Sequence, residues 1–70
     1  MTQDRIMQLV TGRGFVRVFW DELRERRAED STVTQRAVFD DLNDLFEETF
    51  GEPKFPSWEA FRKYRDRLQK

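Results

Sequence analysis

Four carboxylates at helical spacing are the residues of this chain best suited to bind a ligand. Asp40, Asp44, Glu47 and Glu48 recur every three or four residues, so in an α-helix they lie along one side. Such a ridge attracts cations, either a hard metal ion or the Lys and Arg side chains of a partner. A straight helical ridge with no ligand loop rarely wraps a metal ion. We therefore expect no metal site and treat these four residues as candidates for protein binding.

Basic side chains gather in the last part of the chain. Residues 54–70 hold six bases and two acids, whereas residues 29–53 hold eight acids and one base. The basic segment supplies the candidates for binding nucleic acid phosphates, which are Arg62, Lys63, Arg65, Arg67 and Lys70. Glu59 and Asp66 share a helical face with several of these bases, which favours a mixed-charge face turned to solvent. The net charge of −1 also gives no long-range attraction to a polyanion.

Catalytic chemistry is not indicated by the composition. The chain has no Cys and no His, so it has no disulfide, no thiolate metal ligand and no imidazole base. Its hydroxyls have no histidine to activate them, and paired-carboxylate catalysis needs a cleft that 70 residues can hardly form. The Gly12-Arg13-Gly14 triplet lacks the Lys and Ser or Thr of a phosphate loop. We expect a protein that is not an enzyme and binds no cofactor.

Apolar residues recur with helical period in four segments, at about 2–11, 15–28, 33–50 and 58–69. The third is the most clearly amphipathic, because its apolar residues oppose the acidic ridge. We therefore predict an all-α fold, a small bundle of three to four helices that forms a single domain over residues 1–70. The alternation within residues 15–20 also fits a short strand, which we keep as an alternative.

Local signals place the ends of these helices. Gly12-Arg13-Gly14 is expected to break the chain, and Thr32 with Gln35 three residues later forms a capping-box pattern. Gly51 is expected to end the third helix in a left-handed conformation. Ser57 is expected to cap the last helix.

Aromatic residues are expected to dominate the core, since each buries a large apolar area. Trp20 and Trp58 are interpreted as core residues rather than as binding hot spots. The predicted core consists of Phe15, Phe19, Leu23, Val38, Leu42, Leu45, Phe46, Phe50, Trp58, Phe61 and Leu68.

These observations favour a small non-enzymatic protein-binding module, such as an accessory regulator, that acts through charged helical surfaces. The alternative is a helix–turn–helix DNA-binding protein that reads with the basic C-terminal helix, although the connector at residues 51–56 is longer than the usual turn. A third hypothesis is a homodimer whose core the short N-terminal helix completes. Basic side chains paired with the ridge would weaken the DNA hypothesis, and basic side chains gathered apart from it would strengthen it.

The sequence also predicts where the protein works. No apolar run approaches the ~20 residues that span a membrane, and residues 1–12 lack the long apolar stretch of a secretory signal. We therefore expect a cytoplasmic protein with no membrane partner.

Overall fold

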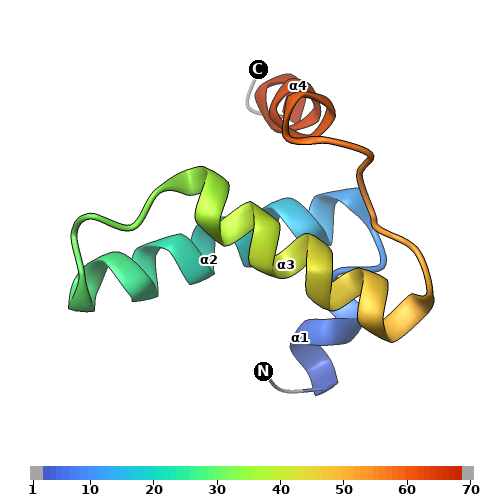
Figure 1. Cartoon of the computed structure of the whole chain (residues 1–70), viewed down its shortest axis with the longest axis horizontal. Coiled ribbons are helices and arrows are strands. Elements are labelled where there is room, and N and C mark those ends of the chain that lie inside the picture. The colour runs from blue at the N-terminus through green and yellow to red at the C-terminus, as the bar shows by residue number, and fades with distance from the viewer. Residues whose placement is uncertain (1–2, 69–70) are drawn as a thin grey trace.

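The computed structural model describes residues 3–68, and within that range every regular element is a helix. The helices are α1 (Gln3–Gln8), α2 (Gly12–Glu29), α3 (Gln35–Phe50) and α4 (Trp58–Leu68). In Figure 1, α2 and α3 run antiparallel side by side, while α4 is seen end-on and so crosses them steeply. The predicted all-α bundle is confirmed, and the short strand considered for residues 15–20 is wrong because they lie inside α2. The predicted helix ends at residues 2 and 69 lie outside the described range.

The glycine triplet does not break the chain but forms the first turn of α2. The Thr11 hydroxyl accepts a hydrogen bond of 2.9 Å from the Gly14 amide and caps this helix. A Cβ on Gly14 would lie 1.9 Å from the carbonyl oxygen of Gln8, and one on Gly12 would lie 2.2 Å from the Tyr64 hydroxyl. Gly14 is therefore required, because its neighbour is backbone, whereas the tip of the Tyr64 side chain can move away from a larger residue at position 12.

The ends of α3 and the start of α4 follow local hydrogen bonds. Thr34, not Thr32, caps α3, and its hydroxyl accepts from the Ala37 amide at 3.2 Å. Thr32 instead donates from its amide and its hydroxyl to the Asp30 carboxylate, so the predicted capping box is wrong. Gly51 ends α3 at φ 94°, in the left-handed region that favours glycine. Ser57 caps α4 by accepting from the Ala60 amide at 3.2 Å, as predicted.

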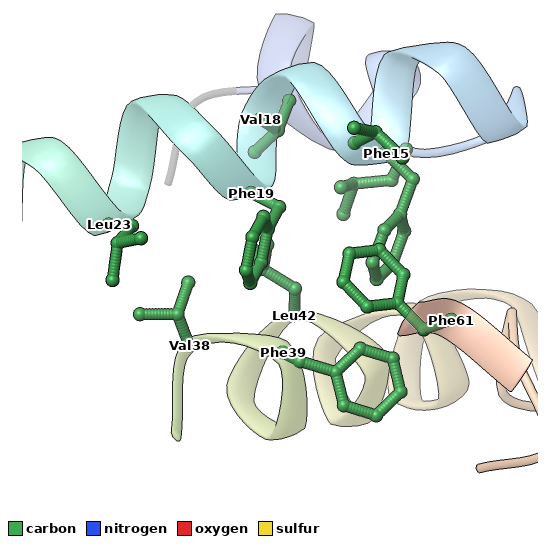
Figure 2. Packing of buried hydrophobic residues seen from close by; sticks show 10 residues of the cluster. Phe15, Val18, Phe19, Leu23, Val38, Phe39, Leu42 and Phe61 are labelled. Atoms are coloured by element: carbon green, nitrogen blue, oxygen red, sulfur yellow. The ribbon is translucent and has the colours of Figure 1, made fainter. Parts of the chain in front are cut away.

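The core is an aromatic cluster centred on Phe61, which α4 inserts between α2 and α3. Its ring centroid lies 4.8 Å from those of Phe19 and Phe39, 5.5 Å from that of Phe15 and 5.2 Å from that of Phe55. Figure 2 shows the Phe61 ring between Phe15 of α2 and Phe39 of α3. All of these pairs fall within the range of favourable aromatic contacts.

The predicted core is correct at its centre and displaced at its edges. Of the predicted residues, Phe15, Phe19, Leu23, Val38, Leu42 and Phe61 are buried. Leu45, Phe46, Trp58 and Leu68 are only partly buried and pack against the cluster. Phe50 is 42 % exposed, so its assignment to the core is wrong. The buried residues that were not predicted are Leu9, Val16, Val18 and Phe39.

We predict that Phe61→Ala removes most of the stability of the fold. Phe61 is fully buried, and truncating such a ring costs roughly 3–5 kcal/mol, comparable to the whole net stability of so small a domain. Urea unfolding followed by circular dichroism measures the loss, with the exposed Phe50→Ala as the matched control. A Phe61→Ala protein as stable as wild type would show that α4 does not belong to the core.

Candidate protein-binding surface on helix α3

The acidic ridge of α3, formed by Asp40, Asp44, Glu47 and Glu48, lies on the side of the helix opposite Leu42 and is exposed along its whole length. None of its four carboxylates forms an ion pair with another residue of the range 3–68. Asp40 and Asp44, and likewise Asp44 and Glu48, are like charges four residues apart. Each such pair destabilises a helix by roughly 0.2–0.5 kcal/mol.

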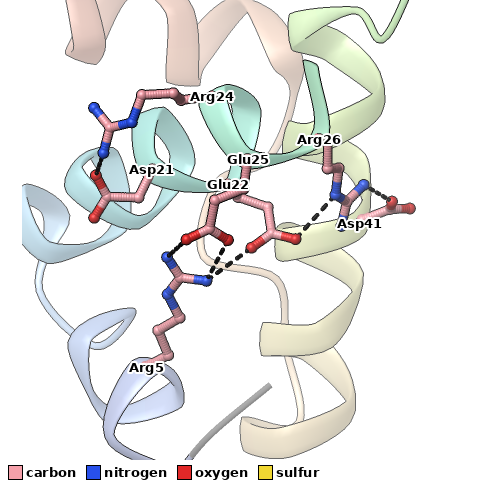
Figure 3. Close-up of polar contacts among 7 residues, drawn as sticks. All are labelled: Arg5, Asp21, Glu22, Arg24, Glu25, Arg26 and Asp41. Atoms are coloured by element: carbon pink, nitrogen blue, oxygen red, sulfur yellow. Dashed lines mark hydrogen bonds and ion pairs between the residues drawn. The ribbon is translucent and has the colours of Figure 1, made fainter. Parts of the chain in front are cut away.

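Three carboxylates of α2 and α3 are paired where helices meet. Figure 3 shows Arg5 of α1 in contact with two glutamates of α2, at 3.1 Å for Glu22 and 3.0 Å for Glu25. Arg26 of α2 contacts Glu22 at 2.9 Å and reaches Asp41 of α3 at 2.5 Å. The hydrogen bond from Arg5 holds the pKa of Glu25 below its usual range. Glu22, Glu25 and Asp41 are thus paired between helices, whereas the four ridge carboxylates form no ion pair within residues 3–68.

The basic candidates of α4 divide into different environments. Arg62 pairs with Glu59 at 2.8 Å on a mixed-charge surface. Lys63 and Arg67 are exposed and make no ion pair within the described part of the chain. Lys70 lies outside the described residues. The surface of α4 therefore offers two uncompensated cations among residues 58–68.

Arg65 is held inside the fold. Only 13 % of its side chain is exposed, and its guanidinium carbon lies 5.8 Å from the ring centroid of Trp20 and 5.7 Å from that of Trp58. It also donates a hydrogen bond to the side-chain oxygen of Gln35 at the start of α3. Arg65 therefore connects α2, α3 and α4, and little of it is left to contact a phosphate.

The ridge and the basic helix do not neutralise each other. No cation of α4 in the range 58–68 pairs with Asp44, Glu47 or Glu48; the pairs that form there stay within α4, from Arg62 to Glu59 and from Arg65 to Asp66. Because the basic side chains of α4 are not paired with the ridge, their position does not weaken the DNA hypothesis. The small number of uncompensated cations on α4 does weaken it.

The sequence did not predict that Phe50 is exposed, and two further large apolar side chains are exposed as well. Met7, Val10 and Phe50 are exposed by 59 %, 41 % and 42 %. Periodicity places Phe50 on the apolar side of α3 and so predicts burial. Its position as the last residue before the Gly51 cap was the one signal against burial, because a helix end can project beyond the elements that cover its middle.

Within the described part of the chain no pocket opens on the surface and no group of acidic residues is arranged to hold a metal ion. No helix among residues 3–68 is long and apolar enough to cross a membrane. An extended surface, rather than a cavity, is what the described fold offers to a ligand.

We predict that Arg65→Lys lowers stability although it keeps the charge. Lysine cannot reproduce the cation–π contacts with Trp20 and Trp58 together with the Gln35 hydrogen bond, so we expect a loss of about 1–2 kcal/mol. The exposed Arg67→Lys is the control and should stay within about 0.5 kcal/mol of wild type. Thermal melts followed by tryptophan fluorescence measure both, and equal stability of Arg65→Lys and wild type would contradict the structural role.

Comparison with known proteins gives no relative. No protein-family model, no curated protein sequence and no solved structure matches this chain. The properties of its own surface are therefore the basis for inferring its function.

Proposed function

We propose that this protein is a small non-enzymatic binding module that recognises a cationic surface of another protein through the acidic ridge of α3. One observation carries the proposal. All four ridge carboxylates are exposed and have no ion-pair partner within residues 3–68, whereas six other acids, on α2, α3 and α4, form ion pairs.

The ridge has the energetic features expected of an interaction surface. Its like-charge neighbours oppose helix formation, and no basic residue among residues 3–68 forms an ion pair with them. Lys and Arg residues of a partner would relieve this repulsion and would also speed the encounter, because complementary charge steers association.

DNA binding through α4 is the second candidate. It is supported by the exposed Lys63 and Arg67 and by the steep crossing of α4 over α3 (Figure 1). Two observations weigh against it. Arg62 and Arg65 are engaged with residues of the fold, and the long connector keeps α3 and α4 from the usual helix–turn–helix spacing.

The proposal predicts that neutralising the ridge weakens partner binding. The variant carries Asp40→Asn, Asp44→Asn, Glu47→Gln and Glu48→Gln, and the matched control neutralises two exposed acids outside the ridge, Glu29→Gln and Glu52→Gln. Affinity capture from the native host followed by mass spectrometry identifies the partner, and titration of the purified partner gives the affinity. We expect binding by the ridge variant to be weaker by about fourfold or more, since each of the four exposed charge pairs contributes roughly 0.2–1 kcal/mol.

A nuclease-treated sample and a titration with fluorescent duplex DNA separate the two candidates. The protein-binding proposal predicts capture that survives nuclease and DNA affinity no tighter than ~10⁻⁵ M at low salt. Capture by the ridge variant equal to that of wild type would contradict the proposal. A sub-micromolar complex with genomic DNA fragments, lost in Lys63→Ala or Arg67→Ala, would establish the second candidate instead.

A further inference from the structure

Two of the three large apolar side chains exposed among residues 3–68, those of Val10 and Phe50, belong to segments that Lys54 connects. The rings of Phe46 and Phe50 lie 4.5 Å apart at the end of α3. The Lys54 ammonium lies 5.6 Å from the centre of the Phe46 ring and donates to the carbonyl oxygen of Val10 at 2.5 Å. These contacts place Val10, in the connector that follows α1, near the end of α3, and we call Val10, Phe46 and Phe50 the apolar patch.

The apolar patch adjoins the acidic ridge. Glu47 and Phe50 are three residues apart on α3, and residues at that spacing are neighbours on a helix surface. An apolar surface rimmed by charged residues is a feature of protein interaction sites. The C-terminal half of α3 thus presents aromatic and acidic side chains next to each other.

We infer that the apolar patch and the ridge together bind a cationic amphipathic helix of another protein. Apolar side chains of that helix cover Phe50 and Val10, and its Lys or Arg residues face Asp44 and Glu47. A helix fits because its side chains recur at three- and four-residue spacing, which matches the spacing of the ridge. The inference rests on the proposed function and names the chemical class of its partner.

The negative charge of the ridge favours a cationic segment over a second copy of this chain as the partner that covers the apolar patch. A two-fold symmetric dimer brings the same surface of both copies together, so pairing through this patch would place one acidic ridge beside another. Like charges across an interface are repelled. A cationic segment instead compensates the ridge carboxylates while it covers the exposed rings.

The test uses three synthetic fluorescein-labelled helical peptides as probes. The first has Leu on one face and Lys beside it at helical spacing, the second replaces Leu by Ser, and the third replaces Lys by Glu. Fluorescence anisotropy measures the dissociation constant of each peptide. We expect the first peptide to bind wild type at least tenfold more tightly than either of the other two.

Variants of the protein then locate the binding surface. Phe50→Ser and, independently, Val10→Ser should each weaken the first peptide about tenfold or more, and the exposed Ala37→Ser near the start of α3 should leave it unchanged. Circular dichroism verifies that each variant is folded. The double variant Asp44→Asn, Glu47→Gln should weaken the first peptide and make its binding less sensitive to salt.

The outcomes separate this inference from the proposed function. If the ridge double variant weakens binding while Phe50→Ser and Val10→Ser do not, the apolar anchor is wrong and the proposed function stands. If neither kind of variant weakens binding, both are wrong. A dimer detected by analytical ultracentrifugation and lost in Phe50→Ser would make a second copy the occupant and would overturn the inference.

Discussion

The burial of Phe61 is the interaction on which the rest of the structure depends. Helix α4 has 11 residues, too few for an isolated helix to be stable in water, and Phe61 is its one fully buried side chain within residues 58–68. The ring contacts α2 and α3 (Figure 2), and it also contacts Phe55 of the connector. Arg65, between Trp20 and Trp58, fixes the same helix one turn further on. Together these two residues set the orientation of α4 over the antiparallel pair.

Charged residues at the helix junctions differ from those of the α3 ridge in whether they form ion pairs. Arg5 and Arg26 form ion pairs where α1, α2 and α3 meet, so electrostatics and the aromatic core hold the same arrangement. The outward side of α3 takes no part in that arrangement, yet it carries a regular row of like charges. Such a row opposes the helix that bears it, which is why we connect the ridge with binding rather than with folding.

Helical period and capping residues predicted most of the fold. All four helices, the Ser57 cap and the Gly51 stop are correct, because each depends on residues close in sequence. The exposure of the ridge was likewise predictable from spacing. The cap of α3 is Thr34 because Thr32 forms hydrogen bonds with Asp30 instead. Phe39 and Phe50 lie on the same side of α3, so the helical period could not show that α4 covers Phe39 but not Phe50. The burial of Arg65 depends on Trp20, far away in the sequence, so no local pattern indicated it.

The central claim, that the ridge does not serve the fold, is tested most directly by the unfolding free energy of Asp44→Asn. This near-isosteric change removes the repulsion of Asp44 with both Asp40 and Glu48, so stability should rise by about 0.4–1 kcal/mol at low ionic strength. The gain should disappear in 1 M salt, where the screening length falls to about 3 Å. A loss of stability in Asp44→Asn at low salt would contradict the account, because it would mean that the carboxylate stabilises the folded protein.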